Sequence, residues 1–192
     1  MEYLGDTAAF FQFLAGAIGI SAYIPLTVGI ITDRAKQSFA AFFLWGLIDA
    51  IAMVSSILQE GNYWLAASNV AGTFFITCLL LSKGQFEWSL TETVTSLLVL
   101  ICLIIWYLAG NTGAIVASSL AVVVAGVPQM SHTLRHPKDT PIVVYMIWLC
   151  ANTLSLWSAR EWTIDEAFYA FCSLLVCAII VAIALTRSRS GR

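Results

Sequence analysis

The chain has 192 residues, of which 60% are hydrophobic and 10% are charged, with a net charge of −2 at pH 7. In a typical soluble chain about half of the residues are apolar and about a quarter are charged. Lipid must therefore solvate most of this surface, and we expect an all-α integral membrane protein. No basic face is available to neutralise phosphate groups, which excludes a nucleic-acid partner.

The apolar segments predict seven membrane-spanning helices. A spanning helix needs about 20 apolar residues, because the hydrocarbon core is about 30 Å thick and a helix rises about 1.5 Å per residue. Short breaks such as Gly110-Asn111 separate the segments, so we expect consecutive helices to run antiparallel. The expected bounds are Thr7–Ile31, Phe39–Leu58, Trp64–Ser82, Ser89–Ala109, Gly113–Met130, Ile142–Trp157 and Ile164–Thr186.

The basic residues predict the orientation, because loops rich in Lys and Arg stay in the cytoplasm. If the N-terminus is outside, every Lys and Arg except Arg160 falls in an inner loop or in the C-terminal tail. The first six residues contain no basic residue, which argues against a cleaved signal peptide. We therefore expect a multi-pass protein of a plasma (inner) membrane, with its N-terminus outside and its C-terminus in the cytoplasm.

Three pairs of residues that are unusual in apolar segments recur at one spacing. Pro25 and Pro128 are 128 − 25 = 103 residues apart, and the same spacing separates Trp45 from Trp148 and Asp49 from Asn152. This regularity predicts two three-helix units, residues 1–85 and 112–192, joined by a linker helix in residues 86–111. Because one helix lies between them, the units would run in the same direction, as parallel repeats do in some transporters.

The fifth predicted helix ends in Val127-Pro128-Gln129, ahead of a basic loop. This segment resembles the Pro-Gln motif of the PQ-loop family, to which the SWEET sugar transporters are related. The matching positions in the first unit, Ile24-Pro25-Leu26, keep the proline and lose the glutamine. The resemblance implies a SWEET-like fold of two triple-helix bundles, with a central pathway that opens alternately to each side. It implies no substrate, since the wider superfamily includes carriers of sugars, amino acids and vitamins, and a sorting receptor.

Asp49 is the one acidic residue deep inside a predicted span. A charge near the bilayer centre costs at least about 2.5–3.5 kcal/mol, so the side chain should face a cavity or a partner. Asp49 is thus a candidate for proton coupling or for recognition of a cation, and the alternative is a protonated structural aspartate. Asn152 occupies the matching place, where an amide can bind substrate or hold helices together.

Trp45 and Trp148 precede these polar residues by one helical turn and so share a helix face with them. An aromatic wall beside a carboxyl group suits a sugar, a ring or a cation, whereas the alternative is an anchor at the membrane interface. Asn69 resembles, by position, the asparagine that lines the substrate site of SWEET-type carriers, although its counterpart is Cys172. The predicted substrate-binding residues are therefore Trp45, Asp49, Asn69, Trp148 and Asn152.

Pro25, Pro128 and Gln129 form the predicted hinge or gate. A proline inside a helix removes a backbone donor and clashes with the carbonyl group one turn earlier, which kinks the helix. The amide of Gln129 could satisfy a carbonyl group freed in this way. The alternative is a static kink. The five cysteines lie in apolar runs and are expected to pack as small hydrophobic residues, without disulfides or a metal site.

These features predict a membrane transporter that moves a small polar solute (a sugar, an amino acid or a related metabolite) by alternating access, with proton coupling left open. The alternatives are a seven-helix receptor or accessory protein that binds a ligand without transport, and a vitamin-uptake facilitator of the nicotinamide riboside type. The sequence contains no nucleophile–base or phosphate-binding motif, so no enzyme activity and no cofactor are expected. The expected partners are the small-molecule substrate, the lipid bilayer and, in a coupled carrier, protons. A homo-oligomer is compatible with the sequence.

Overall fold

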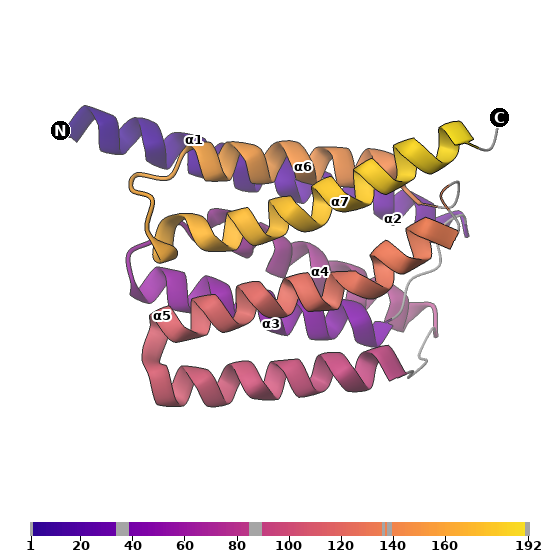
Figure 1. The fold of residues 1–192 in the computed structure, drawn as a ribbon, viewed down its shortest axis with the longest axis horizontal. Coiled ribbons are helices and arrows are strands. Elements are labelled where there is room, and N and C mark those ends of the chain that lie inside the picture. Colours follow the sequence, from indigo (N-terminus) through magenta and orange to yellow (C-terminus); the bar gives the residue numbers. More distant parts are fainter. Residues whose placement is uncertain (1, 34–38, 85–89, 136, 138–139, 191–192) are drawn as a thin grey trace.

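The computed structural model describes residues 2–33, 39–84, 90–135, 137 and 140–190. Over these ranges the chain forms helices and no strand. The helices lie side by side along one long direction (Figure 1). They are α1 (Glu2–Ser21), α2 (Tyr23–Ile31), α3 (Phe39–Leu58), α4 (Trp64–Ser82), α5 (Leu90–Arg135), α6 (Ile142–Trp157), the π-helix η1 (Ile164–Phe168) and α7 (Tyr169–Ser190).

Length and composition make the described helices those of a multi-pass membrane protein. Four stretches are long and apolar enough to cross a bilayer: Thr7–Ile31, Trp64–Ser82, Thr93–Val127 and Ile164–Arg187. Phe42–Leu58 and Ile142–Trp157 are shorter apolar helices. As one straight helix, the 35 residues of Thr93–Val127 would be about 50 Å long, well beyond the hydrocarbon thickness.

That long stretch belongs to α5, which consists of two helices joined at Gly110. Gly110 has φ 71° and ψ −165°, a conformation that is essentially restricted to glycine. Figure 1 shows the two arms of α5 folding back alongside one another at one end of the bundle. Next to this turn the indole Nε1 of Trp106 donates to Oδ1 of Asn111, 2.9 Å away. The break predicted at Gly110-Asn111 is confirmed.

The predicted bounds of α3, α4 and α6 agree with the structure. Other helices are longer than predicted: α1 begins at Glu2, α5 continues to Arg135 and α7 continues to Ser190. The prediction counted apolar residues, but a helix satisfies its own backbone hydrogen bonds and can continue past the hydrocarbon core. The predicted start of the fourth span at Ser89 lies outside the described residues.

The two repeated prolines differ in their effect on the helices. Helical hydrogen bonding is interrupted at Ala22, between α1 and α2. Pro25 lies in the first turn of α2 and cannot donate to the carbonyl group of Ser21, which accounts for a break at this point. Pro128, in contrast, lies in a part of α5 whose backbone stays helical, since the departure from helical angles within α5 is at Gly110. The backbone is therefore not interrupted at Pro128, and the kink predicted there stays a prediction.

The helices pack into a closed ring. α4 contacts both α1 and α3, and α7 contacts both α5 and α6. Two further contacts, α1 with α6 and α3 with α5, complete the circuit. The order around the ring is thus α1, α4, α3, α5, α7, α6, which leaves room for a site at its centre.

The bundle has two ends, which we call the Gly110 end and the C-terminal end. The Gly110 end holds residues 59–63, Gly110 and residues 158–163, and the C-terminal end holds the last turns of α2, α4 and α7. At the C-terminal end, Nζ of Lys83 donates to Oδ1 of Asp33 and to the carbonyl oxygen of Ile30, each at 2.8 Å. The hydrogen bond and the positive charge of Lys83 lower the pKa of the Asp33 carboxyl group. The lysine also caps carbonyl groups at the end of α2.

The turn in α5 predicts a specific sensitivity to substitution. Gly110→Ala should lower the free energy of unfolding by about 1–3 kcal/mol, because alanine is strained at these backbone angles. Thermal unfolding of the detergent-solubilised protein measures the effect. Leu108→Ala is the matched control, since Leu108 is 74% exposed on the adjacent turn. Equal midpoints for the two variants would contradict the assigned conformation of Gly110.

Candidate functional site

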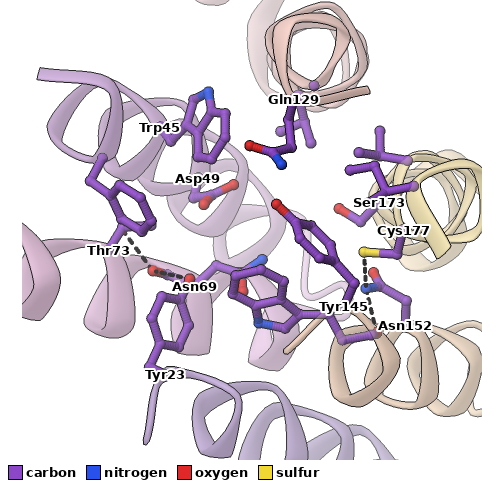
Figure 2. Close-up of a pocket in the computed structure, with 16 residues that line it drawn as sticks. Tyr23, Trp45, Asp49, Asn69, Thr73, Gln129, Tyr145, Asn152, Ser173 and Cys177 are labelled. Carbon is purple, nitrogen blue, oxygen red and sulfur yellow. Dashed lines mark hydrogen bonds between the residues drawn. The ribbon is translucent and has the colours of Figure 1, made fainter. Parts of the chain in front are cut away.

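A cavity of about 100 Å³ lies inside the ring of helices. It is lined by residues of α2, α3, α4, α6, α7 and the second arm of α5. Figure 2 shows polar and aromatic side chains converging on this space from opposite sides. All five predicted substrate-binding residues line it, together with Gln129. The structure therefore brings together residues that are far apart in the sequence.

Asp49 is 6% exposed and is held by a short chain of hydrogen bonds. The hydroxyl group of Tyr169 donates to Oδ1 of Asp49, 2.8 Å away. Nδ2 of Asn69 donates in turn to the Tyr169 hydroxyl group, also at 2.8 Å. The prediction that Asp49 would face a cavity or a partner is confirmed in both respects. Its partner is a neutral hydroxyl group.

The backbone around Asn69 is fixed by side chains of neighbouring turns and helices. Its carbonyl oxygen accepts hydrogen bonds from Oγ1 of Thr73, 2.7 Å away, and from the hydroxyl group of Tyr23, 3.4 Å away. Tyr23 can approach so closely because Gly72 has no side chain, and a Cβ atom there would lie 2.2 Å from the tyrosine ring. The amide of Asn69 is thereby held toward Tyr169.

The opposite side of the cavity contains two buried polar atoms that have no partner among the described residues. They are Nε1 of Trp148 and Oδ1 of Asn152. Nδ2 of Asn152 is used locally, donating to the carbonyl oxygen of Trp148 at 2.7 Å. A buried polar atom left unpaired costs about 1–3 kcal/mol, and such atoms in native structures call for a functional explanation.

Aromatic side chains form much of the remaining wall. Trp148 contacts Tyr23 edge-to-face at 5.3 Å between ring centroids and contacts Tyr145 in the same way at 5.5 Å. Phe42 and Trp45 form a second pair at 5.8 Å. In Figure 2, Trp45 lies next to Asp49, and Tyr145 projects from the other side with its hydroxyl group toward the centre. The carboxyl group is thus framed by rings from both halves of the chain.

The 103-residue spacing found in the sequence also occurs among the residues that line the cavity. Five pairs of lining residues are separated by the same 103 residues as Pro25 and Pro128: Tyr23 and Gly126, Phe42 and Tyr145, Trp45 and Trp148, Asp49 and Asn152, and Thr73 and Val176. Residues that are 103 positions apart in the sequence therefore face one space. Their chemistry differs, because the first half supplies the carboxyl group.

On its Gly110 side the cavity is closed by a cluster of buried side chains. Small and apolar residues from α3, α4, α6 and α7 pack there, namely Ala52, Leu65, Ala66, Ala151, Tyr169 and Ala170. Phe42, Gln129 and Ile180 line the other side of the cavity, nearer the C-terminal end. The space therefore extends from Asp49 toward the C-terminal end of the bundle.

Beyond that cluster, polar contacts tie the helices together at the Gly110 end. Nε of Arg160 donates to Oε1 of Glu166 at 2.8 Å, and its guanidinium group also donates to the carbonyl oxygen of Glu60 at 2.6 Å. Nε2 of Gln12 donates to Oε2 of Glu166 at 2.8 Å, and Nδ2 of Asn62 donates to Oγ of Ser155 at 3.0 Å. We call these contacts the polar seal; all but the Arg160–Glu166 pair join residues 1–85 to residues 112–192.

Two of the predicted hinge residues, Pro25 and Gln129, differ in their position relative to the cavity. Pro25 is half-buried in α2 and is not part of the cavity wall, although Tyr23 is. Gln129 lines the cavity, and its Nε2 donates to Oγ1 of Thr133, 3.4 Å away. The predicted bond from Gln129 to a freed carbonyl group is therefore wrong, because the side chain reaches forward along α5 to a hydroxyl group.

Tyr23, Tyr145 and Tyr169 were missed by the sequence analysis. Tyr145 has the same register relation to the aromatic Phe42 as Trp148 has to Trp45, so the 103-residue spacing could have identified it. Tyr169 follows the π-helix at the start of the last span, where an aromatic residue resembles an interfacial anchor. Nothing in the sequence distinguishes it from such an anchor.

The cysteines differ from one another in their surroundings. All five are free. Cys78 and Cys150 are exposed, which corrects the expectation that all would pack internally; lipid solvates a thiol-bearing surface without penalty. Cys177 lines the cavity, with its Sγ 3.9 Å from Nδ2 of Asn152. Within the described ranges no three His, Cys, Asp or Glu residues are grouped as a metal site requires.

No protein-family model, curated protein or solved structure matches this chain. The function must therefore be argued from the chemistry of the cavity itself.

The hydrogen-bond chain at Asp49 predicts the effect of removing its central hydroxyl group. Tyr169→Phe leaves both Oδ1 of Asp49 and the amide of Asn69 without this partner, so it should destabilise the protein by about 1–3 kcal/mol. Thermal unfolding in detergent measures the change. Tyr107→Phe is the control, since Tyr107 is 90% exposed. If both variants unfold at the parent midpoint, the chain of hydrogen bonds does not hold the site.

Proposed function

We propose that this protein is a membrane transporter that moves a small polar solute by alternating access. The observation that carries the proposal is the central cavity, in which equivalent positions of both halves of the chain face one polar and aromatic space. Transporters built from internal repeats bind their substrates near the midplane, at the interface between the repeats. The volume of the cavity suits a small solute rather than a lipid or a large cofactor.

The packing of the helices supports a parallel repeat and, with it, the resemblance to the PQ-loop and SWEET proteins. If α1 and α2 together form the first span and each arm of α5 forms a separate span, the chain has seven spans. The first arm of α5 is then the linker between the two units. The third helix of each unit, α4 or α7, contacts the other two helices of that unit. A two-fold rotation that places the first unit on the second would place α1 on the second arm of α5 and α3 on α6. It would turn the contact of α1 with α6 into the contact of α3 with α5, and both contacts are present.

The charge distribution supports an orientation in which the Gly110 end is outside. Lys83 and Arg187 then lie on the cytoplasmic side, as the positive-inside rule requires. The polar seal closes the outer side of the cavity, and the space extends toward the cytoplasm. In this conformation, a solute would enter and leave from the inside.

Alternating access requires the polar seal to open, and its composition is suited to that. In the ion pair of the seal the side chain of Arg160 is 44% exposed and that of Glu166 is 9% exposed, so the arginine stays in contact with solvent at the outer end. The apolar cluster beneath it consists largely of alanines, whose contacts are small. A seal made of a few side-chain contacts over small residues can exchange with a second conformation in which the outer side is open.

Reconstituted transport tests the proposal directly. We expect saturable uptake of at least one solute from a panel of labelled glucose, alanine, choline and nicotinamide riboside in proteoliposomes. Trp148→Ala should reduce that uptake by about tenfold or more, because it removes both a ring and a polar group from the wall. Trp162→Ala is the control, since Trp162 is 78% exposed and does not line the cavity. Ligand binding with no flux would favour the receptor alternative.

The proposed conformation predicts one-sided access to Cys177. In a protein carrying Cys78→Ser and Cys150→Ser, a membrane-impermeant thiol reagent should modify Cys177 faster from the cytoplasmic side. Arg160→Ala should increase labelling from outside by about two- to fivefold, in line with the loss of a partly exposed ion pair. Mass spectrometry of inside-out and right-side-out vesicles gives the rates, and Cys177→Ser identifies the site. Faster labelling from outside in the parent protein would contradict the orientation.

A further inference from the structure

The cavity contains one acidic group and no basic group to balance it. Asp49 is the single carboxyl group among its described lining residues, and Lys, Arg and His are absent from that set. The other titratable groups facing Asp49 are the tyrosines of α2, α6 and α7 and the thiol of Cys177, which are neutral in their ordinary forms. An anionic solute would meet only a like charge in this space.

The hydrogen bonds around Asp49 fit an ionised carboxylate. An amide NH₂ group can only donate, so the bond from Asn69 to Tyr169 leaves the tyrosine proton directed at Oδ1 of Asp49. Asp49 thus accepts at Oδ1, as an ionised carboxylate does. A carboxylate in so apolar a setting needs a positive charge nearby, and none of the described lining residues supplies one.

We propose that the solute is a small organic ammonium ion, with the carboxylate of Asp49 as its counter-ion and the surrounding aromatic rings as its cage. The inference rests on the proposed function in taking the cavity as the substrate site. Tyr23, Trp45, Tyr145 and Trp148 supply the rings. Such rings attract cations through their faces, most strongly where water is excluded.

An inorganic cation fits the cavity less well than an organic one. Hard cations such as calcium or magnesium take about six or more oxygen ligands. Here Oδ1 of Asp49 is already engaged by Tyr169, and much of the wall is aromatic. An alkylated ammonium group needs no such shell, because it is stabilised by charge and by ring faces together.

A matched pair of ligands tests the inference without any mutation. Choline and 3,3-dimethyl-1-butanol have nearly the same shape, but only choline is charged. Because Trp45 and Trp148 line the cavity, quenching of tryptophan fluorescence in the detergent-solubilised protein can report binding, and calorimetry provides a second measure. Choline should bind more tightly than its neutral isostere by on the order of tenfold or more.

Asp49→Asn keeps the shape of the side chain and removes the charge, so it should abolish the preference for choline. Glu161→Gln is the control, since Glu161 is exposed and lies outside the cavity; it should leave the preference unchanged. Tetramethylammonium and benzyltrimethylammonium extend the test to smaller and larger cations. Equal affinity for choline and its isostere, with no other ammonium ion bound more tightly, overturns the inference.

The outcomes separate this inference from the proposed function. Selective binding of ammonium ions without flux supports the ligand class and overturns transport. Saturable flux of glucose or another neutral solute, with no selectivity for cations, supports transport and overturns the ligand class. Neutral-solute flux that is driven by a pH gradient and lost in Asp49→Asn identifies the carboxyl group as a proton carrier, which also overturns the ligand class.

Discussion

The burial of one carboxyl group at the centre of an apolar helical ring is the constraint on which the rest of the site depends. A charge at this depth is unfavourable without hydrogen bonds or a counter-charge. Here Tyr169 donates a hydrogen bond to Asp49, and Asn69 donates one to Tyr169. Because these two residues lie on α7 and α4, the hydrogen bonds connect α3 to both halves of the chain. Asp49 and Asn69 also line one side of the cavity.

Two breaks in the helices allow the ring to close around that group. The interruption at Ala22 brings Tyr23 onto Gly72 of α4, where its hydroxyl group reaches the backbone of Asn69. The reversal at Gly110 returns the chain so that the second arm of α5 can contact α3 and α7. Each break has a covalent cause, the missing donor of Pro25 in one case and the freedom of glycine in the other.

The fold was largely predictable because apolar length sets the bounds of a spanning helix. The bounds of α3, α4 and α6 and the break at Gly110 follow from that length and from turn-forming residues. Residue register predicted which positions face one another, so Trp45, Asp49, Trp148 and Asn152 were placed together correctly. Hydropathy could not predict where the helices end beyond the hydrocarbon core, since polar terminal turns carry no such signal.

The partners of these residues were less predictable, because they depend on how the helices rotate and cross. Tyr169 reaches Asp49 only after α7 packs between α5 and α6, and its position near a span boundary gives no sign of this. Gln129 was expected to satisfy a carbonyl group freed by the proline, but its amide instead contacts Thr133. The spacing of residues in the sequence can predict which positions line the same cavity, but it does not predict which side-chain atoms form hydrogen bonds.

The differences between the halves carry more information about the ligand than their likeness does. If both halves had supplied an acid, two carboxylates would share one cavity, and a single monovalent cation could not balance them. Asn152, 103 residues after Asp49, has an amide in place of a carboxyl group, so the described lining holds one carboxyl group, with an amide and an indole on the facing wall. A solute with one charged end and one polar end would bind in a single orientation in such a space. Under the proposed function, the two halves would share the motion of alternating access and differ in what each contributes to recognition of the solute.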